Sequence, residues 1–385
     1  NWTAATQLGA LTAPATSRNI VVGNVNAASA TASAFTWTAI ETSLAAHLDK
    51  ASPSAPADGL AQDRLNYLRG DRSKESNPFR RRTSLLGDII NSGVAFSGKP
   101  TDEISSPTYT VFRNALIEVT GTGGHPARTS AVFVGANDGM LHAFDASNGN
   151  ELFAYIPSWL GPKLSALTSP GYINAHQSYV DGTPVVAEAQ VGSAGTSADW
   201  KTVLVGGTGG GGQGVFALDV TDPTAFSASK VLWEFTNHDD PDMGFVTGRP
   251  QILKLRTSAY NASSTTYKWF AVVPSGVNNY SSANSSGQFG SGNPALFLLE
   301  LGKAAGTSWT LGTLGATKAT GLVNFAATLG NAREVAQMYM GDLHGNLWKL
   351  DFSMEGSANW TMTKLSAFIK GTSPSLIPYP LFIAK

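Results

Sequence analysis

The sequence predicts an all-β fold, a β-propeller, with a short helical segment before it and inserted loops and helices between its strands. The first observation is the stretch 131–157, AVFVGANDGMLHAFDASNGNELFAYIP, in which three apolar runs are separated by two turns. Asn137-Asp138-Gly139 suits a tight hairpin, because Asp-Gly adopts the positive φ angles that such turns require. The second observation is that the unit recurs at 339–351, in looser form at 203–219, and in degenerate form at 295–301. Several strands per repeat indicate the blades of a propeller.

The composition is that of a globular chain with few charges. The 385 residues include 42% hydrophobic and 14% charged residues, and the net charge is −1. The hydrophobic content suffices for a large core, whereas a nucleic-acid-binding protein would carry a basic excess. The absence of cysteine excludes disulfides and thiolate metal sites, and no apolar run reaches the roughly 18 residues of a membrane span. The many small polar residues favour a secreted bacterial protein, and Asn1 in place of an initiator Met indicates a fragment or processed product.

Two helices are expected before the strands begin. Apolar residues fall on one helical face over 37–48, and Thr38 with Glu41 fits a capping box at its start. After a Pro/Ser/Ala linker, a second helix is expected over 61–68. Its predicted end is Gly70, because glycine is the usual residue just past a helix C-terminus.

The rest of the N-terminal region contains little regular structure. The run 20–22 is expected to form an edge strand, and 71–82 to form a polar connector. The Arg80-Arg81-Arg82 run within this connector is interpreted as a solvated surface. We therefore divide the chain into an N-terminal extension at 1–84 and a β-propeller domain at 85–385.

From Leu85 onward the apolar residues alternate as they do in strands. The stretch 109–119 fits either a short helix or a strand, and both alternatives stay open. We interpret 159–177 as a connecting insertion and 275–293 as a long Gly/Ser/Asn loop, of the kind that is often functional or mobile. The other expected strands are 94–96, 185–191, 200–205, 215–220, 249–253, 269–273 and 381–383.

Ten short motifs follow one another between about Leu60 and Asp351. They are YLRGDR at 67–72, LGDI at 86–89, VFVGANDGMLHAFD at 132–145, ELFAYIP at 151–157, VDGTP at 180–184, KTVLVGG at 201–207, GVFALDVTDP at 214–223, LWEF at 232–235, GRP at 248–250 and GDLHGNLWKLD at 341–351. Together they resemble the C-terminal propeller domain of the PilC/PilY family of type IV pilus biogenesis and tip-adhesin proteins.

The resemblance implies a seven-bladed propeller in a protein that is secreted to the bacterial cell surface, outer membrane or pilus tip. It implies a non-enzymatic pilus assembly factor that opposes retraction and acts as an adhesin, supporting attachment and twitching motility. Its partners would be minor pilins or other pilus-tip subunits and a host-cell surface receptor, with no nucleic acid and no membrane span. Because the family continues past the position of Phe382, we expect the last blade or blades to be missing.

The chain departs from the family at its usual calcium loop. The positions that carry carboxylates or an amide in the family correspond here to Thr328, Gly330, Ala332 and Ala336, counted back from Tyr339. Because Ca²⁺ requires several oxygen ligands, we expect no metal at this loop and no cofactor.

A weaker metal alternative is the acidic stretch Asn237–Asp242, which contains Asp239, Asp240 and Asp242. It lacks the alternating spacing and the distal bidentate acid of an EF-hand. A polar turn between blades is the favoured interpretation.

Three further motifs have both a functional and a structural interpretation. Gly206–Gly214 lacks the Lys-Ser/Thr of a phosphate loop, so a glycine-rich hairpin is favoured. Arg69-Gly70-Asp71 spells the integrin-binding tripeptide, but a helix end with solvated charges is favoured. His142 and His344 are expected to face solvent or to hydrogen-bond a turn rather than to bind zinc.

Three aspartates that end equivalent strands are expected to accept backbone N–H bonds at the turns: Asp145, Asp219 and Asp351.

The alternative function is that of a periplasmic quinoprotein-like propeller oxidoreductase. Six tryptophans are similar in kind to the docking tryptophans of quinoprotein dehydrogenases: Trp159, Trp200, Trp233, Trp269, Trp348 and Trp360. Packing between blades explains them more simply. No convergent carboxylate set with a general base accompanies them. We therefore predict no catalytic and no cofactor-binding residues.

Overall fold

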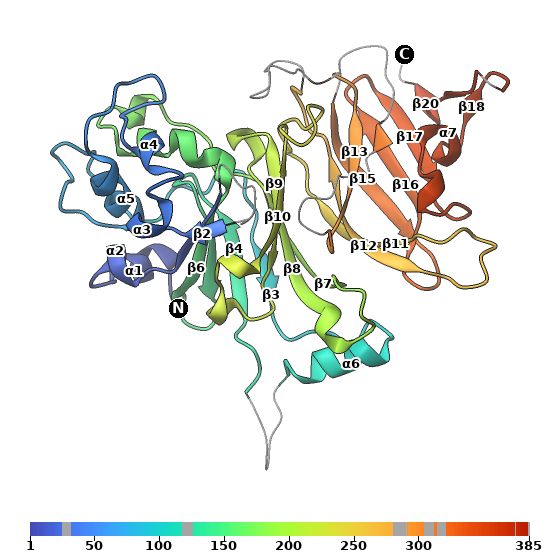
Figure 1. Ribbon diagram of the computed structural model, residues 1–385, viewed down its shortest axis with the longest axis horizontal. Helices are drawn as coiled ribbons and strands as arrows, with labels where there is room; N and C mark the ends of the chain where they lie inside the picture. The colour runs from blue at the N-terminus through green and yellow to red at the C-terminus, as the bar shows by residue number, and fades with distance from the viewer. Residues whose placement is uncertain are drawn as a thin grey trace. The chain divides into compact units, whose positions relative to one another are not determined.

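The computed structural model describes residues 1–24, 32–117, 126–279, 290, 292–303, 312–313, 321–373 and 375–383 (Figure 1). The chain divides into two compact units. Unit 1 comprises Asn1–Glu188, Thr202–Gly212 and Phe216–Glu234, and unit 2 comprises Ala189–Lys201, Gln213–Val215 and Phe235–Lys385. Over the whole chain strands are the main regular element, as predicted. Among the described helices, none is long and apolar enough to cross a membrane.

Unit 1 contains a six-stranded sheet with the order β2-β1-β6-β5-β4-β3. Its centre is the predicted three-stranded stretch, now β4 (Ala131–Gly135), β5 (Leu141–Asp145) and β6 (Glu151–Ile156), which pair antiparallel. Gly139 and Gly149 in the two turns have φ of +97° and +78°, which confirms the predicted turn chemistry. The predicted first propeller strand is β3 (Ala95–Ser97), which pairs with β4.

The N-terminal strand is not at the edge of the sheet, so that prediction was wrong. β1 (Ile20–Gly23) lies between β2 (Ala32–Ala34) and β6, antiparallel to the first and parallel to the second. All four residues of β1 are buried. A short run that is apolar at every position is typical of a strand covered on both faces.

Short helices cover this end of the sheet (Figure 1). They are α1 (Ala4–Gly9), α2 (Pro14–Ser17), α3 (Trp37–Ile40), α4 (Ala45–Leu48) and α5 (Ala61–Arg69). The predicted helix over 37–48 is thus two short helices, although its apolar residues are buried as expected. The capping box was wrong, because α3 begins after Thr36 and Thr38 already lies inside its first turn.

The structure also shows where α5 ends and which secondary structure the stretch 109–119 contains. α5 ends where predicted, since Gly70 caps it with a left-handed φ of +119°. The undecided stretch 109–119 contains α6 (Pro107–Asn114), which begins with a proline after Ser106, a favoured helix start. Residues 118 and 119 lie outside the described part of the chain.

Unit 1 buries a large hydrophobic cluster, in which the N-terminal helices share a core with the strands. Leu48 and Leu65 from the helices belong to the same cluster as Phe133, Phe153 and Tyr155 from the sheet. The segment 1–84 therefore packs as part of this unit, while the division of the chain at residue 85 stays a prediction.

A second sheet has the order β10-β9-β8-β7 and contributes residues to both units. Its strands are β7 (Val185–Gln190), β8 (Trp200–Gly207), β9 (Gly214–Asp219) and β10 (Val231–Thr236). Gly206–Gly214 connects β8 to β9 through the 3-10 turn η4 (Gly209–Gly211), which confirms the glycine-rich hairpin. Further 3-10 turns are η3 (Ser197–Asp199), η5 (Pro223–Ala225) and η6 (Ala228–Lys230).

Unit 2 contains two more four-stranded sheets, with orders β11-β12-β13-β14 and β15-β16-β17-β20. The first is formed by β11 (Gln251–Arg256), β12 (Tyr267–Pro274), β13 (Ala295–Glu300) and β14 (Gly312–Thr313). The second is formed by β15 (Leu322–Leu329), β16 (Val335–Asp342), β17 (Asn346–Asp351) and β20 (Phe382–Ile383). The predicted repeat at 339–351 is the β16–β17 hairpin, turned at Gly345 with φ +76°.

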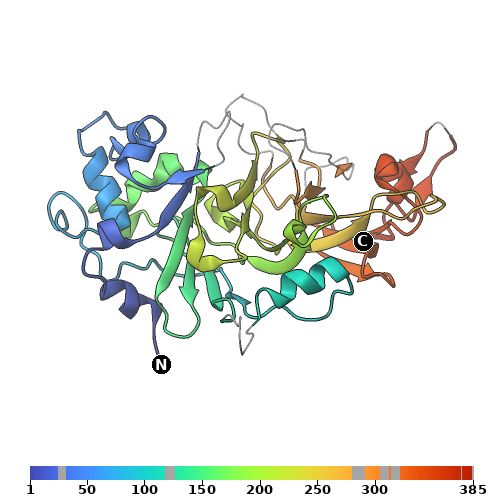
Figure 2. The same cartoon turned by 60° about the horizontal axis from the view of Figure 1, so that its bottom comes forward.

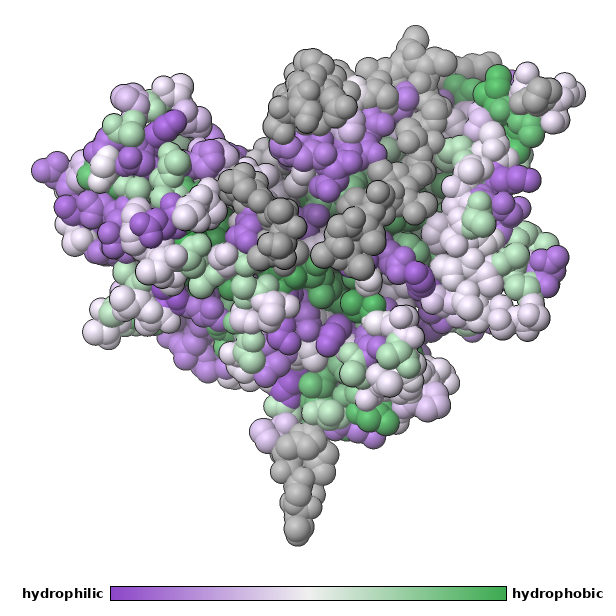
Figure 3. All heavy atoms as spheres, in the orientation of Figure 1, coloured by the Kyte–Doolittle hydropathy of each residue, from purple (hydrophilic) through white to green (hydrophobic). Residues whose placement is uncertain are grey.

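Unit 2 also contains small elements that follow β17 in the chain (Figure 2). They are η7 (Ser357–Asn359), α7 (Met362–Leu365), and the hairpin of β18 (Ile369–Lys370) and β19 (Ile377–Pro378). Figure 3 shows a hydrophobic area over this hairpin, where Ile369 and Ile377 are exposed. Each of the large sheets contains an antiparallel meander of the kind that forms a propeller blade, and the total of seven blades stays a prediction.

Candidate functional site

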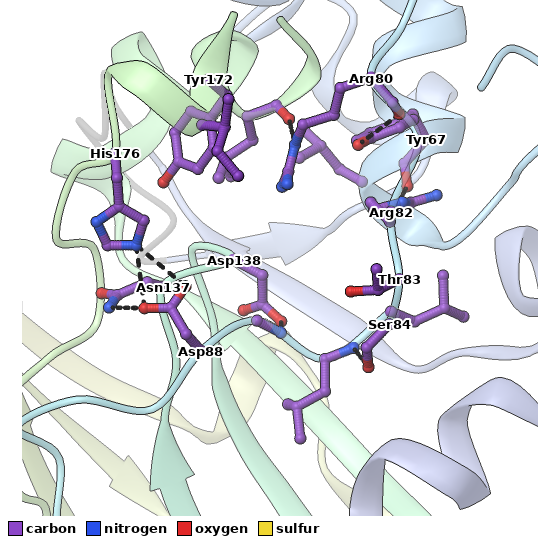
Figure 4. A pocket seen from close by; sticks show the side chains of 16 residues that line it. Tyr67, Arg80, Arg82, Thr83, Ser84, Asp88, Asn137, Asp138, Tyr172 and His176 are labelled. Atoms are coloured by element: carbon purple, nitrogen blue, oxygen red, sulfur yellow. Dashed lines mark hydrogen bonds and ion pairs between the residues drawn. The ribbon is translucent and has the colours of Figure 1, made fainter. Parts of the chain in front are cut away.

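A pocket of about 270 Å³ opens in unit 1 beside the turn between β4 and β5. Figure 4 shows that its walls come from the segment after α5, from this turn and from the insertion that follows β6. The insertion consists of two 3-10 helices, η1 (Ser158–Thr168) and η2 (Tyr172–Asn174). Three of the sequence motifs contribute to the lining, at 67–72, 86–89 and 132–145.

Hydrogen bonds in both directions join the LGDI segment, residues 86–89, to the turn between β4 and β5. Asn137 donates its backbone N–H to the Asp88 carbonyl at 2.9 Å and its side-chain amide to the Asp88 carboxylate at 2.8 Å. In return, Gly87 donates its N–H to the Asp138 carboxylate at 2.8 Å. A Cβ on Gly87 would lie 2.5 Å from the backbone nitrogen of Asp138, so this close approach requires glycine.

A buried chain of alternating charges extends from the pocket wall into the unit. Nε2 of His142 lies 3.1 Å from both carboxylate oxygens of Asp138, and Nδ1 lies 2.8 Å from Oε1 of Glu151. Glu151 also accepts two N–H bonds from Arg18, at 2.6 and 2.8 Å. Because each ring nitrogen of His142 faces a carboxylate, the protonated imidazole satisfies both, and the four groups balance in charge.

The pKa values of these groups follow from their contacts. Burial alone lowers the pKa of His142, but attraction to Asp138 and hydrogen bonds to Asp138 and Glu151 outweigh it and raise the pKa to about 9. Burial raises the pKa of Glu151, but Arg18 and His142 reverse the effect and lower it to about 2. All four groups are therefore charged at neutral pH. The expectation that His142 faces solvent was wrong, whereas its hydrogen bond to the turn, through Asp138, is confirmed.

The arginine run was expected to be solvated, and the structure corrects this for Arg80 and Arg82. The Arg82 guanidinium lies 3.6 Å from the centroid of the Tyr67 ring and 2.7 Å from the Glu75 carboxylate. Arg80 is partly buried against Tyr172, with its guanidinium 4.7 Å from the ring centroid. Arg81 alone of the three is exposed. The cause is tertiary, since the segment after α5 folds back and brings its arginines onto aromatic faces and carbonyl oxygens.

The tripeptide at 69–71 forms the predicted helix end, but its arginine is not solvated as expected. Arg69 is buried, and its guanidinium donates to the carbonyls of Phe35 at 2.6 Å and Arg18 at 2.9 Å. Its side chain is therefore unavailable to an extracellular receptor.

The mouth of the pocket carries an ion pair, with Nε2 of His176 3.0 Å from Oδ2 of Asp88 and both side chains 44% exposed. Arg80 lies on the wall across from this pair, on the same side of the pocket as Thr83 and Ser84 (Figure 4). None of the pocket's polar residues was named as a site residue from the sequence. The available signal was the presence of Asp88, Asn137 and Asp138 within the motifs that carry the family resemblance.

The weak metal alternative at Asp239, Asp240 and Asp242 lies between β10 and β11, where its carboxylates serve the turn itself. Asp239 accepts the N–H of Thr236 at 2.9 Å, and Asp240 accepts the N–H of Asp242 at 2.8 Å. Burial raises the pKa of Asp240. Within the described ranges, no group of three or more His, Cys, Asp or Glu side chains is placed to hold a metal ion.

The remaining sequence candidates have structural roles. The strand-ending aspartates accept turn N–H bonds as predicted, at 2.8 Å for Asp145 with Ser147, 3.0 Å for Asp219 with Thr221 and 2.9 Å for Asp351 with Ser353. The N–H of His344 donates to Asp342 in the β16–β17 turn.

Tryptophans at several of the candidate positions contact other aromatic rings. Trp200 meets Trp269 edge-on at a centroid distance of 6.1 Å, and Trp360 meets Phe270 at 5.4 Å. These contacts fit the packing interpretation.

The repeated antiparallel meanders define this protein as a β-propeller. Comparison with known proteins agrees, because the family model described as the PilY1 beta-propeller domain matches residues 86–362. The chain belongs to the PilY1 beta-propeller domain family.

Curated relatives show how much of a longer protein this chain corresponds to. The type IV pilus biogenesis factor PilY1 of Pseudomonas aeruginosa (strain PAK) is 40% identical over 330 residues, which are 82% of this chain and 25% of that protein. A PilY1 homolog of Xylella fastidiosa (strain Temecula1) is 35% identical over 348 residues, 83% of this chain and 21% of that protein. The chain thus spans about a quarter of the length of these relatives.

A solved structure is similar as well. The crystal structure of the Pseudomonas aeruginosa PilY1 C-terminal domain shares 33% sequence identity, covering 67% of this chain and 45% of that one, with a TM-score of 0.46.

Proposed function

We propose that this protein is a non-enzymatic type IV pilus assembly factor that opposes pilus retraction and serves as a tip-associated adhesin. The observation that carries the proposal is the match of residues 86–362 to the PilY1 beta-propeller domain, together with relatives named as pilus biogenesis factors. In this proposal the protein is secreted to the cell surface, outer membrane or pilus tip. There it contacts minor pilins or other pilus-tip subunits and a host-cell receptor, and it supports attachment and twitching motility.

The architecture supports a role in binding. Packed meanders provide a rigid scaffold, and insertions carried on such a scaffold are the usual place for recognition. The insertion that follows β6 presents Ile173 on η2 at 83% exposure, beside the pocket. The long Gly/Ser/Asn loop 275–293, a second candidate contact surface, lies largely outside the described residues. No observation favours the quinoprotein-like alternative, so it is not proposed.

The assembly role predicts the phenotype of a strain that lacks the gene. Surface pili should disappear when the gene is deleted and return when the retraction motor is deleted as well, because a factor that opposes retraction is dispensable once retraction stops. Electron-microscopic counts of pili in the single and double deletion strains measure this. The full-length gene restored in the single deletion is the control. Pilus numbers that stay unchanged in both deletion strains would contradict the proposal.

We also propose that the loop at 328–336 holds no calcium ion. Thr328, Gly330, Ala332 and Ala336 bring no carboxylate, and the ammonium of Lys254 donates a hydrogen bond to the Ala332 carbonyl. A cation at this carbonyl opposes the binding of a second one by charge repulsion.

Protein soaked in calcium and then desalted is expected to retain no calcium at this loop, as measured by mass spectrometry of the metal content. The matched positive control restores the family pattern with Thr328→Asp, Gly330→Asn, Ala332→Asp and Ala336→Asp. One tightly held equivalent in the native chain that is lost on Ala332→Lys substitution would refute the proposal.

A further inference from the structure

The pocket beside the β4–β5 turn contains one guanidinium that is held in place while its outer edge remains unused. Arg80 donates its Nε–H to the Leu167 carbonyl at 2.8 Å, and its backbone N–H to the Thr168 carbonyl at 2.9 Å. Its planar group lies against the ring of Tyr172, whose hydroxyl donates to the Gln177 carbonyl at 3.2 Å. Among the residues that the structure describes, no hydrogen-bond or ion-pair partner meets its two terminal nitrogens.

The buried arginines nearby differ from Arg80 in this respect. Arg82 donates to Glu75 and to the carbonyls of Tyr67 and Asp71. Arg18 is engaged in the same way by Glu151. Arg80 is therefore the preorganised donor of this pocket, and a fixed guanidinium edge with two nitrogens is suited to bidentate binding of a carboxylate.

Figure 4 shows where such a carboxylate would lie. The terminal nitrogens of Arg80 point into the space between Asp138 and Thr83, and the Thr83 hydroxyl points to the same space. Thr83 is exposed, and its hydroxyl also has no hydrogen-bond partner within the described ranges. These groups provide donors for one carboxylate at this wall.

The opposite wall limits what can carry the carboxylate. Asp138 already accepts from Gly87, Met140 and His142, whereas Asp88 is 44% exposed and can accept a further bond. A phosphate dianion or a polyanion would be repelled by these two carboxylates. An acidic side chain of a peptide brings a single charge, and its own backbone N–H or a neighbouring basic side chain can face Asp88.

The aromatic residues of the pocket argue against a sugar. Sugars usually stack on an open aromatic face, but Arg82 covers the face of Tyr67 and Arg80 covers that of Tyr172. The volume of about 270 Å³ is also at the lower end for small-molecule sites, which start at about 300 Å³. A single side chain with its flanking backbone fits this space, with exposed Ile173 at the rim as an apolar contact.

We propose that this pocket binds an acidic side chain of a partner polypeptide, with the carboxylate held by Arg80 and an adjacent N–H or ammonium group facing Asp88. The inference goes beyond the proposed pilus role and does not depend on it, because it concerns the chemistry of the pocket alone.

The test uses a single cysteine at the rim. The chain contains no cysteine, and Ile173 is 83% exposed, so Ile173→Cys creates a unique thiol beside the pocket. The variant is equilibrated with the mixed disulfides that 2-mercaptoethanol forms with acetyl-Cys-Gly-Asp-Lys-amide and with acetyl-Cys-Gly-Asn-Lys-amide, at a fixed excess of free 2-mercaptoethanol. The protein thiolate attacks the peptide sulfur of each disulfide and releases 2-mercaptoethanol, so the exchange needs no oxidant. Intact mass then gives the fraction of protein joined to each peptide. The aspartate peptide is expected to be captured about tenfold better, the ratio that one good charge-assisted interaction produces.

Two arginine variants in the same background separate the pocket from the overall charge. Arg80→Gln is expected to abolish the preference for aspartate, whereas Arg81→Gln, the same charge change on an exposed neighbour, is expected to keep it. Thr83→Val is a second pocket variant, and its folding is not at risk because the residue is exposed. It should reduce the preference for the aspartate peptide about two- to threefold, because one hydrogen bond to the carboxylate is lost. Circular dichroism confirms that each variant is folded.

Three results would overturn the proposal. One is equal capture of both peptides by the Ile173→Cys chain. Another is an equal loss of preference in Arg80→Gln and Arg81→Gln, which would reflect net charge only. The third is competition by inorganic phosphate at a lower concentration than by N-acetylaspartate amide, which would make the site a general anion site.

Discussion

Replacing Glu151 by glutamine is expected to lower the free energy of unfolding of unit 1 by about 3–5 kcal/mol, the range found when one partner of a buried ion pair is removed. The Arg18 and Glu151 side chains are each only 3% exposed, with Nε and Oε2 2.6 Å apart. The substitution leaves Arg18 and His142 both charged, buried and without this carboxylate. Asp138 is then the one remaining carboxylate of the network, so the desolvation of two buried cations is offset by one opposite charge instead of two.

The measurement is urea unfolding followed by circular dichroism, with hydrogen exchange of the β5 amides to localise the loss to unit 1. Asp63→Asn is the matched control, because Asp63 pairs with Lys74 at 3.5 Å in the same unit and their side chains are 33% and 48% exposed. Exposed pairs contribute about 0–1 kcal/mol. Equal losses in the two variants would show that burial of the Arg18–Glu151 pair has no special importance.

The stability of unit 1 is expected to fall as the pH rises from about 6.5 to about 9, because of His142. Its pKa rises from the ordinary value of 6.5 to about 9 in the folded chain. Between these values the folded state keeps a proton that the unfolded state has released, so each unit of pH lowers the free energy of unfolding by about 1.4 kcal/mol. The total is about 3 kcal/mol, fully present below pH 6.5 and lost above pH 9.

The variant His142→Gln is expected to be less stable than the native chain at pH 6.5 and to lack this slope. The readout is the difference in the free energy of unfolding between the native chain and the variant at each pH. A difference is needed because burial lowers the pKa of Lys163 to about 8, and this group therefore changes the stability in the opposite direction at higher pH. His176→Gln is the control for the substitution itself, because this histidine is 44% exposed and lies outside the buried network. A native chain and His142→Gln variant with parallel pH profiles would refute the role of His142.

These expectations could not be formed from the sequence. His142 alternates with apolar neighbours in β5 and occupies a hairpin, which suggested an exposed position. Its burial arises because β5 is covered on both faces, one of them by the N-terminal segment that supplies Arg18. The same reason explains the error at Arg80 and Arg82, whose surroundings are aromatic rings and carbonyls from other parts of the chain.

The sequence by itself determined what depends on near neighbours in the chain. Alternating apolar residues and Asp-Gly turns specify strands and hairpins locally, so the meander at 131–157, the hairpin at 339–351 and the end of α5 at Gly70 were all predicted correctly. The ten ordered motifs identified the family for the same reason, since they can be read along the chain.

Only the tertiary structure decided which of these pieces meet. Arg18 and Glu151 are 133 positions apart, and Asp88 and His176 are 88 apart, so no local pattern connects them. Whether a charged side chain is buried or exposed depends on the partner that folding places beside it, because burying an isolated ion costs far more free energy than burying a paired one. The sequence therefore identified the scaffold and its family, and the packing of distant segments created the charged network and the pocket with its free guanidinium edge.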